Sequence, residues 1–282
     1  MNIESNEHPI IQNPSPFESS MVRWILIAFF LTLVTATLTY GVLQDLSNYI
    51  YFVGMLVIVV TLKKMRKIKM RVLVGRKPYS YRWLSTLFIS LVLLCYANAA
   101  IILVIYPLIL LDSEVIAEFF MQPLDKTPIH AFVMTVLLAP VLEELVFRGL
   151  VFTRLCMKWG MTLGIILSSL FFGLLHFEFF VGALVIGVVL CVIYVRTKTL
   201  LVPMSIHGVY NFLVWLILIS NSDQNLYLSK EMMEGYLYQG LVALIISSPV
   251  IFFMLGSWWP RGDIRAPYES NVLYMLSDSP SH

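Results

Sequence analysis

Long runs of apolar residues, separated by short polar segments, dominate the pattern of the chain. A membrane-crossing helix needs about 20 mainly apolar residues, and eight runs approach that length. They cover Met21–Leu43, Leu46–Leu62, Trp83–Leu111, Ile129–Leu155, Met161–Phe180, Val181–Val195, Leu200–Ser220 and Tyr236–Trp259. The second and sixth runs are short, and almost no loop separates the fifth run from the sixth. The pattern predicts an all-α, polytopic membrane helix bundle with about eight transmembrane helices.

The composition supports this reading. Hydrophobic residues make up 59% of the 282 residues, and charged residues only 13%. A soluble domain usually contains about a quarter charged residues, and one soluble core of this length cannot bury so much apolar surface. We therefore expect the lipid bilayer to cover the remainder. The net charge of +2 gives no reason to expect nucleic-acid binding.

The polar segments suggest how the chain is organised. Residues 1–20 are polar and contain three prolines, so they predict a disordered tail. Four parts follow from the pattern: the tail 1–20, the N-terminal transmembrane helices 21–128 with a basic loop at 63–82, the core helices 129–220, and a last helix with a tail at 221–282.

Lys and Arg are distributed unequally between the two sides of the predicted bundle. Residues 63–82 contain nine Lys or Arg and no acid. If the spans alternate, the same side also receives Arg154, Lys158, Arg196, Lys198, Arg261 and Arg265. The positive-inside rule then places this side, together with both termini, in the cytoplasm.

Three of the predicted spans contain ionisable or polar residues, which are costly in a membrane and by default mark function. They are Glu143, Glu144 and Arg148 in the fourth span, His176 (one turn after Phe172) in the fifth, and His207 and Asn211 in the seventh. A single buried histidine more often joins two helices through a hydrogen bond. Two histidines with two glutamates and an asparagine, on three spans, favour a functional site.

Helical geometry separates the two glutamates. Glu144 and Arg148 are four residues apart and share a face, so an ion pair is expected. Glu143 lies about 140° from Arg148 around the helix and is free to face another group. Two carboxylates in such different environments are one way to obtain a base that works near neutral pH. A purely structural role through Arg148 fits Glu144 better than Glu143.

The remaining residues suggest water activation. His207 and Asn211 are one turn apart, so both can point at a developing oxyanion, or Asn211 can orient the imidazole. Phe172 lies one turn before His176 and is expected to pack against its ring. A glutamate base beside a histidine, with His207 and Asn211 as oxyanion donors, suffices for amide hydrolysis.

The residues also leave a metal mechanism open. Glu143, His176 and His207 form a ligand set for a catalytic zinc with an open water position. From the sequence, the protein either uses no cofactor or binds zinc, and both possibilities stay open. Asn211 favours the metal-free version, because asparagine is a poor zinc ligand and its spacing from His207 suits a pair of donors.

These motifs resemble a known family. Glu-Glu-x-x-x-Arg, Phe-x-x-x-His and His-x-x-x-Asn occur in this order within Ile129–Ser220, as in the CPBP family of type II CAAX prenyl proteases and bacterial bacteriocin-processing, Abi-like proteins. The resemblance implies an eight-helix intramembrane endopeptidase in which Glu143, His176, His207 and Asn211 are essential, with Glu144 and Arg148 in support. It also implies a membrane-associated peptide or lipidated protein as substrate, and it favours a bacterial plasma membrane. The family is often named a metalloprotease, although a glutamate-dependent mechanism has also been proposed.

Two alternatives use the same buried Glu/His set. One is a non-catalytic immunity or scaffold protein, which would tolerate loss of Glu143. The other is a proton-coupled transporter, but transporters usually contain inverted repeats and the sequence shows no repeat.

The depths of the motifs pose one difficulty. Glu143 lies 11 residues from Arg154, or about 16 Å along a helix, whereas His176 lies 18 residues from Lys158, or about 27 Å. We therefore expect a non-helical start of the fifth span, around Gly160–Gly164, that returns His176 to the depth of Glu143.

Overall fold

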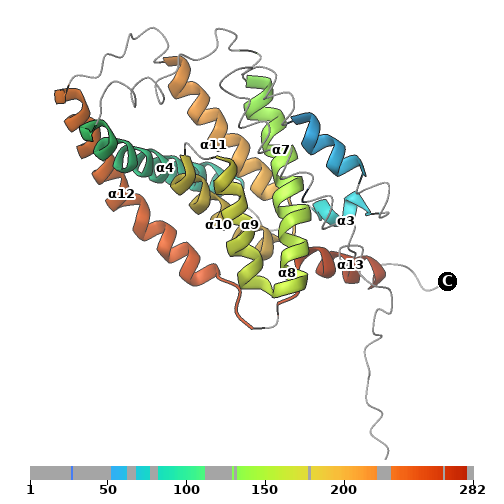
Figure 1. Ribbon diagram of the computed structural model, residues 1–282. Coiled ribbons are helices and arrows are strands. Elements are labelled where there is room, and N and C mark those ends of the chain that lie inside the picture. The colour runs from blue at the N-terminus through green and yellow to red at the C-terminus, as the bar shows by residue number, and fades with distance from the viewer. Residues whose placement is uncertain are drawn as a thin grey trace, which may run out of the picture.

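The computed structural model describes residues 27, 52–61, 68–76, 82–111, 129, 132–176, 179–220, 230–262 and 264–277. Every element within these residues is a helix (Figure 1), so the all-α prediction is confirmed. The predicted tail 1–20 and, apart from residue 27, the predicted first span lie outside the described residues. A helix over Phe52–Thr61 falls within the predicted second span.

The long helices follow the predicted apolar runs closely. They are α4 (Leu84–Leu111), α9 (Met161–Leu175), α10 (Phe180–Thr197), α11 (Leu201–Ser220) and α12 (Lys230–Trp258). Within the described part of the chain, segments of α4, α10, α11 and α12 are long and apolar enough to cross a membrane. The chain is thus an integral membrane protein of helical build, and the total of eight spans stays a prediction.

The fourth predicted span forms one helical run whose hydrogen-bond register changes. It consists of η1 (Phe132–Leu138), α7 (Ala139–Glu143), η2 (Glu144–Phe152) and α8 (Thr153–Trp159), where η1 and η2 are π-helical. A π-helix pairs each N–H with the carbonyl five residues back instead of four, and such segments are frequent at functional sites. Pro140 lies in the first turn of α7, where its missing N–H costs least. The run continues to Trp159, four residues beyond the predicted end at Leu155.

This longer helix removes the difficulty over depth. Only Gly160, with φ +85°, separates α8 from α9, and α9 is helical from Met161 onwards. The predicted non-helical start at Gly160–Gly164 is therefore wrong. Counted from this common turn, Glu143 lies 17 residues before Gly160 and His176 lies 16 residues after it. The depths counted from Arg154 and Lys158 differ because these residues lie six and two residues before the turn.

Small residues allow the core helices to approach closely. A Cβ atom at Gly187 of α10 would lie 2.9 Å from the Cβ of Ser169 on α9. One at Gly164 of α9 would lie 2.8 Å from the Cα of Cys156 on α8. Both distances are too short for a real carbon contact, so neither glycine can be replaced without moving a helix. Close contacts through small residues are typical of helix packing in membranes.

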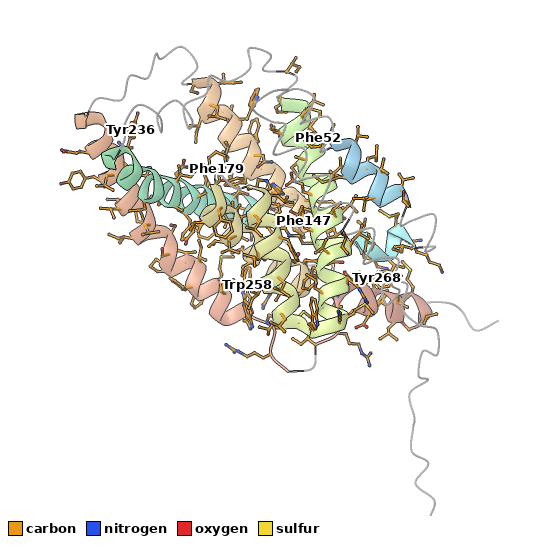
Figure 2. All side chains as sticks on the ribbon, in the orientation of Figure 1. Phe52, Phe147, Phe179, Tyr236, Trp258 and Tyr268 are labelled. Atoms are coloured by element: carbon orange, nitrogen blue, oxygen red, sulfur yellow. The ribbon has the colours of Figure 1, made fainter. Side chains whose placement is uncertain are left out.

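One end of the bundle carries paired cations and tryptophans. The Nζ of Lys158 lies 4.3 Å from the ring centre of Trp159, where α8 ends. The guanidinium of Arg196, near the end of α10, lies 5.1 Å from the ring of Trp258, where α12 ends. In Figure 2, Trp258 and Tyr236 lie at opposite ends of α12. Tryptophan and basic residues gathered at one level are typical of a membrane–water interface.

Two short helices, which lie beside each other in Figure 1, contact the turn between α10 and α11. They are α3 (Met70–Val74), within the predicted basic loop, and α13 (Pro267–Ser277), within the predicted C-terminal tail. The sequence pattern predicted neither helix.

The carbonyls at the end of α3 receive donors from elsewhere in the fold. Tyr194 Oη donates to the carbonyl of Leu73 at 3.1 Å, and Thr199 Oγ1 donates to that of Val74 at 3.0 Å. Asn271 Nδ2 of α13 donates both to the carbonyl of Val72 and to that of Lys198, at 3.0 and 2.9 Å. The last carbonyls of a helix need such partners, so α3, α13 and the α10–α11 turn form one connected unit.

Candidate active site

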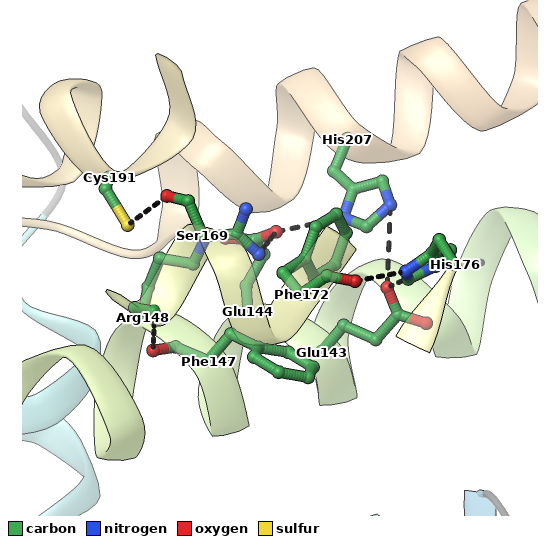
Figure 3. A network of polar contacts seen from close by, with 10 residues as sticks. Glu143, Glu144, Phe147, Arg148, Ser169, Phe172, His176, Cys191 and His207 are labelled. Carbon is green, nitrogen blue, oxygen red and sulfur yellow. Dashed lines mark hydrogen bonds and ion pairs between the residues drawn. The ribbon is translucent and has the colours of Figure 1, made fainter. Parts of the chain in front are cut away.

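The carboxylate of Glu143 lies where three helical runs meet. Glu143 is the last residue of α7 and is only 4% exposed. Its Oε2 lies 3.8 Å from Nε2 of His176, at the end of α9, and 3.8 Å from Nε2 of His207, on α11 (Figure 3). Both distances exceed a direct hydrogen bond, and polar groups at such distances can be joined through a water molecule. The three residues predicted as the chemical centre are therefore neighbours in space.

The end of α9 fixes the orientation of His176. The N–H of His176 donates to the carbonyl of Gly173, three residues back, at 3.0 Å. Its ring Nδ1 lies 2.8 Å from the carbonyl of Phe172, four residues back, and takes the place of the usual main-chain donor. Because a carbonyl can only accept, Nδ1 carries the hydrogen. In the neutral ring, Nε2 then presents a lone pair towards Glu143.

His207 is held in the same way, but by a carboxylate. Its Nδ1 lies 2.9 Å from Oε1 of Glu144. The same Oε1 accepts a hydrogen bond from Nη1 of Arg148, also at 2.9 Å, which confirms the predicted ion pair. An ionised carboxylate only accepts hydrogen bonds, so Nδ1 of His207 is the donor. Nε2 of His207 thus also presents its lone pair towards Glu143 when the ring is neutral.

Phe172 lies in the middle of this cluster. Its ring centre lies 4.4 Å from that of His176, and the two rings are tilted by 38°. The guanidinium of Arg148 lies 4.4 Å from the same ring, and Phe147 meets the ring edge to face at 5.2 Å. Phe172 therefore packs against the imidazole of His176, as predicted, and also links it to the Arg148–Glu144 pair.

Arg148 is fully buried. Its Nε and Nη2, and Oε2 of Glu144, have no hydrogen-bond partner among the described residues. Buried charges are costly unless they are paired, so the aromatic ring of Phe172 and the carboxylate of Glu144 together compensate the guanidinium. The stability of the helix that carries Glu144 and Arg148 therefore depends on its packing against Phe172 of α9.

Asn211 makes a contact that the sequence did not suggest. Its Nδ2 donates to the carbonyl of Thr135 in η1 at 2.8 Å. Pro140, five residues after Thr135, has no N–H, so it cannot return a main-chain hydrogen bond in the π register. One of the two N–H groups of Asn211 thus joins α11 to η1.

Sequence reasoning missed Ser168 and Ser169 on α9. Both are about 1% exposed, and Ser168 Oγ donates to the carbonyl of Phe147 in η2 at 3.0 Å. Ser169 Oγ donates to the carbonyl of Ile165 in its own helix at 2.7 Å. The available signal was a pair of hydroxyls in the middle of an apolar span, four residues before the Phe172 motif begins.

A zinc ion bound by Glu143, His176 and His207 would need its ligands closer together than these side chains are. Two ligands of a tetrahedral zinc, each about 2.0–2.1 Å from the ion, lie roughly 3.4 Å apart. The observed separations between Glu143 Oε2 and each Nε2 are 3.8 Å. In the part of the chain that the structure describes, no three His, Cys, Asp or Glu side chains form a group that fits a metal ion. The side chains as they stand therefore do not fit zinc.

The comparison with known families agrees with the geometry. Residues 125–213 match the family model described as "Type II CAAX prenyl endopeptidase Rce1-like". This Rce1-like domain supports the CPBP/CAAX protease family for the chain, and a membrane protease of the CAAX type as its class. No curated protein and no solved structure matches the chain. All of the residues discussed above, from Thr135 to Asn211, lie within the matched segment.

Proposed function

We propose that this chain is an intramembrane endopeptidase that hydrolyses a peptide bond of a membrane-associated, lipidated protein or peptide, using water activated by Glu143. One observation carries the proposal: the buried Oε2 of Glu143 lies 3.8 Å from two imidazole nitrogens on two other helices. Both imidazoles are oriented through Nδ1, so a neutral ring offers only a lone pair towards the carboxylate. A water molecule between these three acceptors can donate its two hydrogens to two of them, Glu143 being one.

The position of His176 suggests how substrate and water reach Glu143. The His176 side chain is 30% exposed, whereas those of Glu143 and His207 are 5% exposed. α9 contains 15 residues, or about 22 Å, which is shorter than the hydrocarbon core of about 30 Å. Figure 1 agrees, because α9 and α10 end below the upper ends of α11 and of the η1–α8 run. The turn at His176 therefore lies at membrane depth, where irregular backbone is tolerated beside protein or a water-filled cavity.

In the proposed reaction, Glu143 removes a proton from the bound water as its oxygen attacks the carbonyl carbon of the substrate. The carbonyl oxygen becomes an oxyanion, which the second N–H of Asn211 stabilises together with His207 when its Nε2 is protonated. Glu144 stabilises the charge on His207 through Nδ1. Glu143 then returns its proton to the leaving nitrogen as the C–N bond breaks, giving a carboxylic acid, which keeps the second hydrogen of the water, and an amine.

The test uses the purified full-length protein and a fluorogenic peptide with a prenylated cysteine, in lipid vesicles. Glu143→Gln removes the base but keeps the size of the side chain, so cleavage should fall at least a hundredfold while the melting temperature stays within a few degrees. Glu234→Gln replaces an exposed acid on α12 and is the matched control. Full cleavage by Glu143→Gln would exclude the proposed mechanism. Absence of cleavage by the unmodified protein with prenylated and unmodified peptides alike would count against the proposed function.

A further inference from the structure

The two π-helical segments flank the residue that carries the proposed chemistry. η1 ends at Leu138 and η2 begins at Glu144, so the short α7 that ends at Glu143 lies between them. π-helical pairing is rare and is usually limited to single turns. η2 has nine residues, so other groups must stabilise it.

Hydroxyl groups supply this stabilisation. Ser168 Oγ donates to the carbonyl of Phe147 at 3.0 Å, and Thr153 Oγ1 donates to the carbonyl of Arg148 at 3.4 Å. These two carbonyls are consecutive in the middle of η2. A carbonyl oxygen has two lone pairs, so it can accept a hydroxyl in addition to a main-chain N–H.

Ser168 differs from most other serines in the described helices. Ser169, Ser205 and Ser247 each donate to the carbonyl four residues back in their own helix, at 2.7, 2.6 and 2.6 Å. This is the local bond that a serine within a helix usually makes. Ser168 instead donates from α9 across to η2, and it does so in a fully buried position.

The register of η2 determines the geometry of the cluster around Glu143. In an α-helix one residue corresponds to a rotation of 100°, so a slip of one residue would turn Phe147 and Arg148 away from their partners. Both residues contact the ring of Phe172, which packs against His176. Arg148 also holds Glu144, which orients His207.

We propose that Ser168, assisted by Thr153, holds η2 in the π-helical register and thereby positions Glu143 and Glu144 relative to the two histidines. Ser168 is then a positioning residue that never touches the substrate. Its effect on cleavage rests on the proposed function, whereas its effect on the register of η2 does not.

The first experiment measures amide hydrogen exchange in the purified full-length protein. Ser168→Ala removes the donor. Ser169→Ala is the matched control, because Ser169 is equally buried and, among the residues that the structure describes, its hydroxyl bonds within α9 and to Cys191. Loss of one buried hydrogen bond should speed exchange of the amides of residues 144–153 on the order of fivefold. Ser169→Ala and Ser168→Thr, which keeps the hydroxyl, should leave that exchange unchanged. Equal exchange in Ser168→Ala and Ser169→Ala would overturn the proposal.

The second experiment measures cleavage by the same variants. Misplacement of a catalytic group by a fraction of an ångström lowers the rate of chemistry, so kcat of Ser168→Ala should fall on the order of tenfold or more while KM changes by less than about twofold. Ser168→Thr should recover most of kcat. Thr153→Val, which removes a hydroxyl but keeps the shape, provides a second test if Ser168→Ala does not fold. A change in KM alone, or a loss that Ser168→Thr does not recover, would contradict positioning.

Discussion

Nδ1 of His207 and Oε1 of Glu144 lie 2.9 Å apart, although 63 residues separate them in the chain. The same oxygen also holds Arg148 at 2.9 Å. Glu144 therefore acts on the site through His207, because it sets which ring nitrogen carries a hydrogen and which faces Glu143. A histidine fixed by a carboxylate on one nitrogen and used on the other is a recurrent arrangement in catalytic sites.

The two glutamates should respond differently to the same substitution. Glu144→Gln leaves the fully buried Arg148 without a compensating charge, and breaking a buried pair typically costs about 3–5 kcal/mol. We expect a clear loss of melting temperature and of yield, measured by thermal unfolding in detergent. Combining Glu144→Gln with Arg148→Met should restore part of the stability, because the uncompensated guanidinium is then absent. A fully stable Glu144→Gln would contradict this account of the pair.

Asn211 is expected to contribute to the rate of cleavage as well as to the fold. Asn211→Ala removes the proposed oxyanion donor, and the loss of one such donor typically costs on the order of a hundredfold in kcat. It also removes the bond to Thr135, which should cost about 1 kcal/mol of stability. Measuring kcat and thermal unfolding on the same samples separates the two effects. If kcat hardly changed while stability fell, Asn211 would only join α11 to η1.

Metal dependence follows from the spacing of Glu143 and the histidines. Because the three side chains are too far apart for zinc, purified protein should contain much less than one equivalent of metal by elemental analysis, and cleavage should survive exhaustive chelation. Adding zinc back serves as the control. About one metal ion per chain, lost together with activity and restored by zinc alone, would show that the three residues move together around an ion.

The end of the bundle with the Lys158–Trp159 and Arg196–Trp258 pairs is predicted to face the cytoplasm. Reporter fusions after Pro78 and at the C-terminus should both report the cytoplasm, because this side carries the excess of Lys and Arg. A fusion at Asp223, between α11 and α12 in the sequence, should report the opposite side. A reversed signal at any of the three positions would refute the orientation and the alternation of spans.

The C-terminal helix α13 is predicted to stabilise the core. Asn271 joins the carbonyls of Val72 and Lys198, so Asn271→Ala should lower the free energy of unfolding by about 1–2 kcal/mol. Asn271→Asp should cost more, because a carboxylate cannot donate and would face two carbonyl oxygens. Ser270→Ala changes the neighbouring half-buried residue and is the control. Chemical unfolding of the purified protein provides the comparison.

The sequence by itself determined the helices, which polar residues meet in the candidate site, and the pairing within one helix. A transmembrane helix must contain its own apolar run, so α4, α11 and α12 lie close to the predicted spans. Glu144 and Arg148 meet because neighbours four residues apart share a face. Three polar motifs on apolar spans indicated the site. Ionisable groups inside a bilayer lower the stability of the protein, so they are usually kept only where they have a function.

The tertiary structure alone decided how these parts fit together. The π register of η2 depends on a hydroxyl that α9 supplies through Ser168, and no local pattern within residues 144–152 encodes that donor. Asn211 reaches Thr135 only because α11 packs against η1. α3 and α13 are short and have weak apolar patterns, so they form on surfaces that other helices provide. Hydrophobic periodicity records which residues avoid water, whereas the registers and caps of these helices depend on hydrogen-bond partners that lie far away in the chain.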